Sequence, residues 1–147
     1  MKKREDSVVK DVFEGQLLVK YSCTRCTAEE HCFQPYWDLL LSFDHSKKKE
    51  WHNLIDMLSD FQNTESVSEF SCRRCKKDNS YCKTNTEIWR LPKVLIISFK
   101  RFMLRNGEYQ KDENGVKFPV KSLDLSRLIK QSGISNISPV KLISLRT

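Results

Sequence analysis

Short stretches of this chain alternate between apolar and polar residues, which is the pattern of half-buried β-strands. One such stretch, 16–22, leads directly into Cys23. A second stretch, 36–43, places four apolar residues on one face: Trp37, Leu39, Leu41 and Phe43. Its other face is only partly polar because it includes Leu40. The pattern predicts two strands that each pack one face against a core.

The hydrophobic period changes between residues 46 and 61. Apolar residues there follow the i, i+3, i+4, i+7 spacing of one helix face: Trp51, Leu54, Ile55, Leu58 and Phe61. Asp44 and Ser46 are the candidate N-caps. We therefore expect one amphipathic helix that packs against the strands.

Two further segments, 67–71 and 81–91, are rich in β-branched and aromatic residues, which favours extended structure. They bracket a pair of cysteines, so they predict a hairpin with thiols at its tip. The run 94–99 is apolar at successive positions. That pattern is typical of a strand buried on both faces.

The last third of the chain contains turn signals and two short apolar segments. The dipeptides Asn106-Gly107 and Asn114-Gly115 accept positive φ at low cost, so they predict turns on either side of 108–113. The segment 123–129, followed by Gly133, indicates a short helix with its stop signal. A final strand is expected at 140–145.

The chain has 147 residues and a mass of 17.4 kDa, which fits one domain with a substantial core. No apolar run approaches the roughly 20 residues that span a bilayer, and the charged start has no apolar signal segment. These features argue against a transmembrane or secreted protein. We expect an intracellular protein, cytoplasmic or nuclear, in which the six cysteines stay reduced.

The strongest chemical signal is a pair of Cys-x-x-Cys motifs, Cys23–Cys26 and Cys72–Cys75. Two residues between thiols let both sulfurs of a loop reach one tetrahedral zinc ion, and two such loops complete the coordination. Four thiolates leave no position for water, so the predicted zinc is structural. The intervening segment is longer than the roughly 15 to 20 residues of a simple zinc ribbon, so it must contain structure of its own. The alternative is four ordinary cysteines.

The net charge of +7 invites a nucleic-acid function, but the 26 Lys and Arg residues are spread along the chain. Five of these cations lie beside the cysteine pairs, where they would offset the negative charge of a zinc tetrathiolate: Arg25, Arg73, Arg74, Lys76 and Lys77. A dedicated nucleic-acid function is therefore not favoured.

The remaining cysteines and histidines have weaker signals. Cys32 and Cys82 have no partner at ligand spacing and are interpreted as small core residues. His31 and His45 are secondary candidate zinc ligands. A thiol nucleophile needs a neighbouring base and an orienting group, and no cysteine lies in a recognisable context of that kind. The sequence therefore predicts no catalysis by this chain on its own.

Several segments together, in order and spacing, resemble the middle of the ubiquitin-specific protease catalytic domain. They are 11–17, the two cysteine pairs, 35–41, 91–102 (Leu-Pro-Lys-Val-Leu-Ile-Ile-Ser-Phe-Lys-Arg-Phe), 116–119 and 123–125. The resemblance covers roughly residues 11–145. Members of this family are cysteine peptidases that hydrolyse the isopeptide bond at the ubiquitin C-terminus.

The resemblance implies an α+β fold: zinc-tipped antiparallel β fingers plus part of a papain-like palm sheet with one packed helix. We expect residues 1–147 to form a partial domain of this family. The fingers would comprise about 15–35 and 66–90, and the partial palm about 36–62 and 91–147.

The resemblance also implies the site residues and partners. Cys23, Cys26, Cys72 and Cys75 correspond to the ligands of one structural zinc ion. Phe102 corresponds to a residue near the ubiquitin C-terminal tail, and Leu104 and Tyr109 lie in a segment that matches a loop over that tail. The implied partners are ubiquitin or ubiquitinated proteins, with no membrane.

Two departures from the family pattern affect the expected activity. Nothing before Asp11 resembles the box that supplies the nucleophile, and the chain ends at Thr147, where the catalytic histidine would follow. We therefore expect a thiol-dependent deubiquitinase fragment that is inactive alone. Two alternatives remain open: a non-catalytic, zinc-dependent ubiquitin-binding or scaffold module, and a basic zinc-ribbon nucleic-acid binder.

Overall fold

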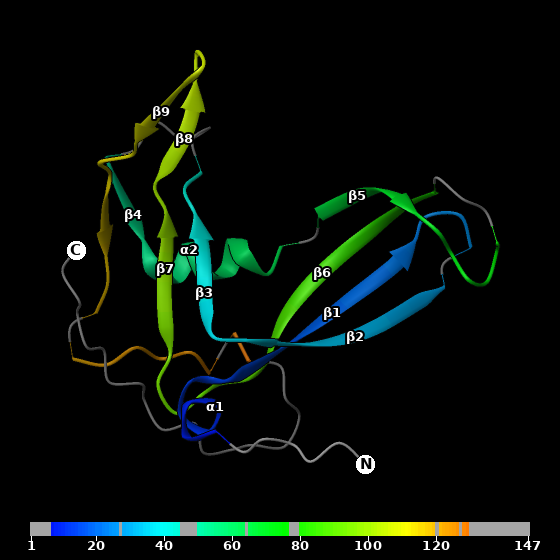
Figure 1. Cartoon of the computed structure of the whole chain (residues 1–147), viewed down its shortest axis with the longest axis horizontal. Coiled ribbons are helices and arrows are strands. Elements are labelled where there is room, and N and C mark those ends of the chain that lie inside the picture. The colour runs from blue at the N-terminus through cyan, green and yellow to red at the C-terminus, as the bar shows by residue number, and fades with distance from the viewer. Residues whose placement is uncertain are drawn as a thin grey trace.

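The computed structural model describes residues 7–26, 28–44, 50–63, 65–76, 80–119, 121–126 and 128–129. The elements fall into two groups (Figure 1): a long sheet that extends to one side, and a set of shorter strands around one helix. In chain order they are α1 (Val8–Phe13), β1 (Gly15–Cys23), β2 (Glu29–Tyr36), β3 (Asp38–Ser42), β4 (Trp51–Asn53), α2 (Leu54–Phe61), β5 (Glu65–Phe70), β6 (Ser80–Arg90), β7 (Ile96–Lys100), β8 (Phe102–Arg105), β9 (Glu108–Lys111) and β10 (Gly115–Lys117).

The long sheet, which we call the finger sheet, has the strand order β2-β1-β6-β5 and is antiparallel throughout. The strands predicted at 16–22 and 81–91 and the thiol-bearing hairpin of β5 and β6 are confirmed. The edge strand β2 was not predicted from the sequence. Seven of its eight residues are not buried, so no apolar alternation marks it.

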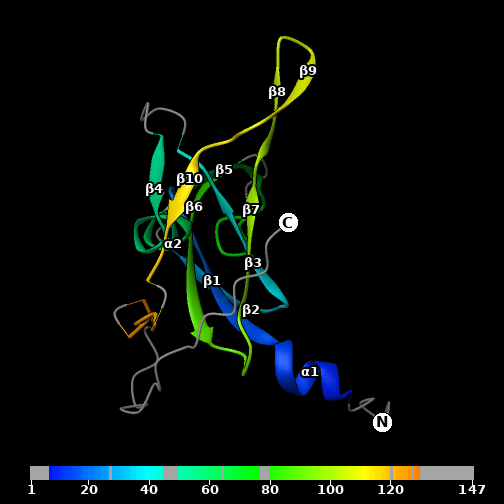
Figure 2. The ribbon, with the colours of Figure 1, turned by 90° about the vertical axis from the view of Figure 1, so that its left-hand side faces the viewer.

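The second group, which we call the palm group, contains three two-stranded sheets. β3 pairs with β7 and β4 pairs with β10, both in parallel, and β8 and β9 form an antiparallel hairpin. The hairpin projects beyond the other strands (Figure 2). α2 packs next to β3 and β4. The predicted class, antiparallel fingers with a packed helix in a mixed α+β fold, is confirmed.

One core lies between the palm group and the base of the finger sheet. Its fully buried side chains come from β3, α2, β6 and the segment after β10: Leu39, Leu41, Leu58, Ile88, Leu123 and Leu125. Burial of these aliphatic side chains is the main stabilising contribution. No helix in the described part of the chain is long and apolar enough to cross a membrane.

The predicted helix at 46–61 is too long. The helix begins at Leu54, and its N-cap is Asn53, whose Oδ1 accepts a hydrogen bond from the Ile55 amide at 2.9 Å. Trp51 lies instead in β4, where its ring is 55% exposed and lies against Gly115 of the paired strand. Pairing with a distant strand thus overrides the helical spacing. Neither Asp44 nor Ser46 is the cap, and Ser46 is outside the described residues.

The expectation of a strand at 94–99 buried on both faces is wrong. β7 begins at Ile96, whose side chain is 40% exposed, and among the described residues it pairs only with β3. Ile96 shares the outer face of this pair with Leu40, whereas Ile97 packs on the core. In β3 the predicted apolar face holds except at Trp37, which precedes the strand and is 41% exposed.

The turn predicted at Asn106-Gly107 is confirmed, with φ values of 52° and 84° between β8 and β9. Asn114-Gly115 makes no such turn. Gly115 begins β10 without a positive φ, and its missing side chain leaves room for the Trp51 ring.

The helix predicted at 123–129 is also wrong. The described residues there form a turn, closed by a bond from the Leu128 amide to the Leu125 carbonyl oxygen at 2.9 Å. Ile129 then bridges to Ile88 of β6. The apolar spacing arises because the leucines of this turn enter the core. Gly133 and the strand predicted at 140–145 lie outside the described residues.

Candidate metal centre

Four thiols converge at the tip of the finger sheet. Cys23 and Cys26 come from the loop after β1, and Cys72 and Cys75 come from the loop between β5 and β6. Their sulfur atoms all lie within 4.8 Å of one another. Across the two loops, the Cys26 and Cys72 sulfurs are 3.5 Å apart, and those of Cys23 and Cys75 are 4.0 Å apart.

These distances fit a tetrahedral metal ion. Zinc–sulfur bonds of about 2.3 Å separate the sulfurs of a regular tetrahedron by about 3.8 Å. Cys23 and Cys72 are buried, and Cys26 and Cys75 are partly exposed. A donor set of four thiolates suits zinc and leaves no coordination position for water or substrate. The chemistry that these residues support is therefore structural.

The backbone of the two loops favours thiolates at this centre. The amides of Cys26 and then Arg25 hydrogen-bond to the Cys23 sulfur and lower its pKa to about 7. The amides of Cys75 and Arg74 likewise lower the pKa of Cys72. The loop backbone therefore stabilises the metal-binding thiolate form of these cysteines before any ion binds.

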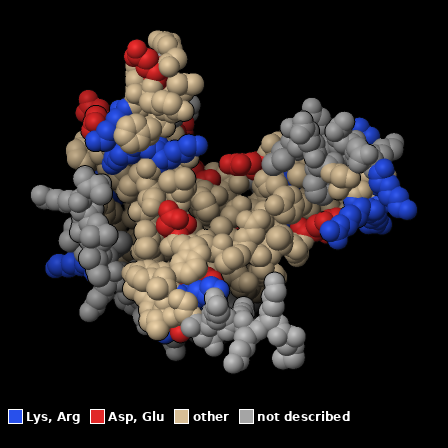
Figure 3. Space-filling model, in the orientation of Figure 1, with Lys and Arg blue, Asp and Glu red and all other residues tan. Residues whose placement is uncertain are grey.

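Basic side chains surround the same end of the molecule. Figure 3 shows Lys and Arg residues gathered at the outer end of the finger sheet. Arg25, Arg73, Arg74 and Lys76 are all exposed. Lys77, the fifth cation noted in the sequence, is outside the described residues.

The secondary candidates do not join the cluster of four thiols. Cys82 is buried directly opposite Cys23 in the β1–β6 register, and its pKa is raised by burial and then by the charge of Cys23. Cys32 is exposed on β2. His31 lies 3.8 Å from a Glu29 carboxylate oxygen. The other candidate histidine, His45, lies outside the described residues.

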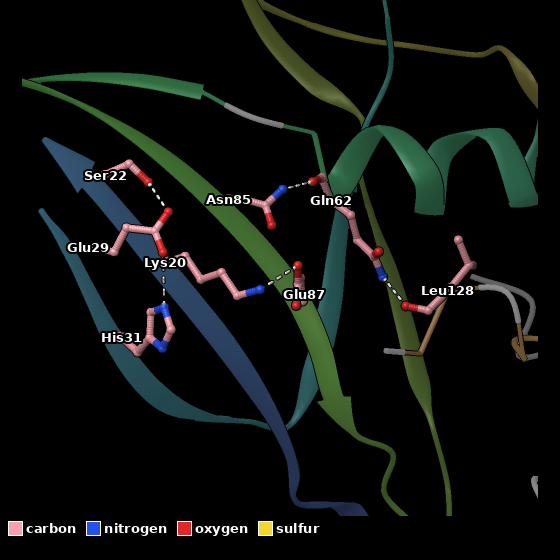
Figure 4. Close-up of polar contacts among 8 residues, drawn as sticks. All are labelled: Lys20, Ser22, Glu29, His31, Gln62, Asn85, Glu87 and Leu128. Carbon is pink, nitrogen blue, oxygen red and sulfur yellow. Dashed lines mark hydrogen bonds and ion pairs between the residues drawn. The ribbon is translucent and has the colours of Figure 1, made fainter. Parts of the chain in front are cut away.

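Polar contacts of β6 join it to β1 within the finger sheet and to the palm group (Figure 4). Lys20 Nζ lies 3.0 Å from Glu87 Oε1, and the Glu87 side chain is 5% exposed. Further along β6, Asn85 Nδ2 donates to the Gln62 carbonyl oxygen at 2.8 Å, and Gln62 Nε2 donates to the Leu128 carbonyl oxygen at 2.8 Å. The two contacts of Gln62 fix the base of the fingers and the Leu128 turn against the end of α2. The sequence contained no signal for them.

The β8–β9 hairpin carries an exposed apolar stripe. Phe102, Leu104 and Tyr109 are 61%, 62% and 78% exposed. Leu104 faces Tyr109 across the hairpin, and Phe102 faces Lys111, so all four share one face. Exposed apolar residues grouped in this way indicate a binding surface.

Arg101 holds the base of this hairpin. Its Nη1 donates to the carbonyl oxygens of Asp112 at 2.9 Å and Asn114 at 2.8 Å. Its guanidinium also lies over the rings of Phe43 and Phe99, 5.1 and 5.7 Å from their centroids. Sequence reasoning missed this role, for which the only signal was the Lys-Arg-Phe end of the 91–102 motif.

Comparison with known proteins gives a consistent result. The family model described as ubiquitin carboxyl-terminal hydrolase matches residues 1–145. Ubiquitin carboxyl-terminal hydrolase 2 of Gallus gallus is 34% identical over 132 residues, covering 88% of this chain and 36% of the relative. Ubiquitin carboxyl-terminal hydrolase Usp2 of Drosophila melanogaster is 31% identical over 124 residues, covering 84% of this chain and 13% of the relative. The chain thus spans about a third or less of the length of these relatives.

Solved structures agree with the sequence comparison. The SAGA Ubp8/Sgf11/Sus1/Sgf73 DUB module bound to ubiquitin aldehyde contains a chain with a TM-score of 0.69 and 28% identity. The match covers 88% of this chain and 28% of that one. A structure of the yeast SAGA DUB module with an Sgf73 variant gives the same TM-score and identity.

Proposed function

The chain belongs to the ubiquitin carboxyl-terminal hydrolase family, and from this membership we propose that it forms the fingers and part of the palm of a ubiquitin-specific protease catalytic domain. The fingers comprise about 15–35 and 66–90, and the partial palm comprises about 36–62 and 91–147. The division is supported by the separation of the finger sheet from the palm group.

One structural zinc ion, held by Cys23, Cys26, Cys72 and Cys75, ties the two finger loops together. The convergence of these four sulfurs within 4.8 Å carries this proposal. Zinc bound there supplies folding energy, because the loops come from strands far apart in sequence. A reduced four-thiol site also fits an intracellular protein, cytoplasmic or nuclear.

The palm group and the finger sheet together recognise ubiquitin. The molecule is hollowed between them (Figure 3), and the β8–β9 hairpin stands at one side of this hollow. Phe102, Leu104 and Tyr109 supply apolar contacts for the ubiquitin tail. Their exposure on one face of the hairpin supports this role, and the similar Ubp8 module bound to ubiquitin aldehyde supports ubiquitin as the partner.

The family reaction is thiol-dependent hydrolysis of ubiquitin isopeptide bonds, and this chain alone does not perform it. Acyl transfer needs a thiol with an adjacent base. Four of the cysteines form the metal centre, and Cys82 is buried. Cys32 and His31 are successive residues of β2, so their side chains point to opposite faces. Within the described residues, no cysteine outside the metal centre is therefore arranged as a nucleophile with a histidine base.

Two measurements on the zinc-loaded chain test this proposal. Isothermal titration with ubiquitin should show binding, and ubiquitin with an electrophilic C-terminus should form no covalent adduct. A covalent adduct would contradict the proposed inactivity. Absence of binding by a folded, zinc-loaded chain would contradict the ubiquitin-recognition role.

A further inference from the structure

Four cations lie on the two cysteine-containing loops, and together we call them the basic tip. Arg25 lies inside the first Cys-x-x-Cys loop, Arg73 and Arg74 lie inside the second, and Lys76 follows it directly. All four are exposed. The short sulfur–sulfur distances between the loops bring these cations to the same end of the finger sheet, where the basic side chains gather in Figure 3.

The backbone that carries the basic tip is well defined. Lys76 has a φ of 49°, in the left-handed region that non-glycine residues rarely adopt. Its amide donates to the Cys72 carbonyl oxygen at 2.8 Å, which closes the second loop. The cations therefore project from short, constrained turns. Binding of a partner would cost little conformational entropy, because the backbone beneath the cations is already ordered.

Most of this positive charge has no protein counterpart. Arg73 lies 3.9 Å from a Glu30 carboxylate oxygen, but its side chain is 89% exposed, so solvent screens the pair. In the part of the chain that the structure describes, Arg25, Arg74 and Lys76 have no ion-pair partner. A zinc ion with four thiolates would carry a charge of about −2. Even with Arg73 balanced by Glu30, the other three cations exceed that charge by about one, so the two loops keep a small net positive charge.

The residues around the basic tip indicate whether it suits a nucleic acid or a shorter acidic segment. Glu29 and Glu30 of β2 and Glu65 of β5 lie on the two edge strands behind the tip. An extended phosphate backbone that continued along the sheet would meet these carboxylates. The described loop residues 22–26 and 71–76 also contain no aromatic side chain on which a nucleic-acid base could stack. The positive area is short and confined to the tip.

We propose that the basic tip is a docking site for a short acidic segment of a partner protein. The three arginine guanidinium groups suit bidentate pairing with carboxylates, and Lys76 adds a further charge. The basic tip lies at the outer end of the fingers, far from the β8–β9 hairpin that supplies the proposed contacts for the ubiquitin tail. It gives the fingers a second role in choosing a partner or substrate.

The test uses the zinc-loaded chain and a fluorescein-labelled oligoglutamate peptide, with binding followed by fluorescence anisotropy at low and physiological salt. A short DNA duplex with the same label is measured in parallel. The test variant is the double substitution Arg25→Ser/Arg74→Ser. The matched control is Lys93→Ser/Lys121→Ser, which removes two exposed charges elsewhere. Zinc content and melting temperature are compared in all three proteins.

The peptide should bind the parent chain and the control equally, and bind the Arg25→Ser/Arg74→Ser variant about fivefold more weakly. Zinc content should be the same in all three. Equal affinity of both double variants for the peptide, or no binding at low salt, would overturn the proposal. Tighter binding of the duplex than of the peptide at physiological salt would overturn it in favour of nucleic acid.

Discussion

Arg101 and Asp112 bind each other in both directions at the base of the β8–β9 hairpin. The Asp112 amide donates to the Arg101 carbonyl oxygen at 2.6 Å, and Arg101 Nη1 donates to the Asp112 carbonyl oxygen at 2.9 Å. The Asp112 carboxylate in turn accepts from the Asn114 amide at 2.8 Å. These bonds close the two ends of the hairpin against the aromatic rings of the palm group. The exposed apolar stripe is thereby held in a fixed position.

Replacement of Arg101 should therefore loosen the hairpin. Arg101→Ala removes two charge-assisted hydrogen bonds and two cation–π contacts, so we expect a loss of about 1–3 kcal/mol in unfolding free energy. Amide hydrogen exchange across 102–111 should accelerate more than exchange in the finger sheet. Lys100→Ala is the control, because Lys100 is exposed beside Arg101. Equal exchange rates in both variants would contradict the role of Arg101.

Two glycines provide a matched test of close packing. A Cβ at Gly15 would clash with the Tyr36 ring, which is buried in the core, so moving the ring would disturb the packing around it. We expect Gly15→Ala to cost about 1–3 kcal/mol in denaturant unfolding. A Cβ at Gly115 would clash with Trp51 in the same way, but that ring is 55% exposed and can turn outward. Gly115→Ala should therefore cost less.

A double-mutant cycle identifies the cause of the Gly15 effect. If the clash with the ring is responsible, the cost of Gly15→Ala should largely disappear in a Tyr36→Ala background. An unchanged cost in that background would mean that the backbone, rather than the ring, resists the substitution.

The sequence predicted the elements whose apolar residues face the core at regular spacing. β1 and β3 were predicted in this way, β6 was predicted from its β-branched and aromatic residues, and the paired thiols marked the tip of the finger sheet. Prediction from apolar spacing failed where the spacing of apolar residues does not match their burial in the structure. Trp51 fits a helical stripe but lies exposed in β4, and β2 has almost no buried face to reveal it.

Contacts that depend on the tertiary arrangement also could not be predicted from the sequence. The sequence pattern predicted a turn at Gly115, but in the structure the absence of a side chain there allows the Trp51 ring to lie close to its backbone. Arg101 and the Lys20–Glu87 pair depend on residues brought together from distant elements. No local sequence pattern predicts a contact between residues of distant elements. Each Cys-x-x-Cys motif, in contrast, defines the geometry of its loop within four residues.

Loss of one proposed zinc ligand should affect the whole fold. Cys72→Ser should abolish stoichiometric zinc binding, as measured by elemental analysis, and lower the melting temperature by about 10 °C or more. Cys32→Ser is the matched control, because Cys32 is exposed on the same sheet and outside the cluster. Retention of zinc and an unchanged melting temperature in Cys72→Ser would contradict a structural zinc site.

Zinc affinity should depend on pH in a direction set by the cysteine pKa values. Hydrogen bonds from the Cys26 and Arg25 amides lower the pKa of the Cys23 thiol from its usual 9.0 to about 7. As the pH rises above 7 this thiol becomes mostly thiolate, so zinc displaces fewer protons from it. Below pH 7 zinc must displace that proton, so affinity falls more steeply as the solution becomes acidic. Competition with a chromogenic chelator between about pH 6 and 8 measures this; an affinity independent of pH would contradict it.

The apolar stripe of the hairpin should dominate ubiquitin binding. Leu104 is 62% exposed and faces Tyr109, so Leu104→Ser removes apolar contact without opening the core. We expect affinity for ubiquitin to fall about tenfold with little change in melting temperature, because a few apolar anchors usually carry most of the binding energy. Val8→Ser is the control, since Val8 is 78% exposed on α1, away from the hairpin. Equal ubiquitin affinity of the two variants would place the binding surface elsewhere on the molecule.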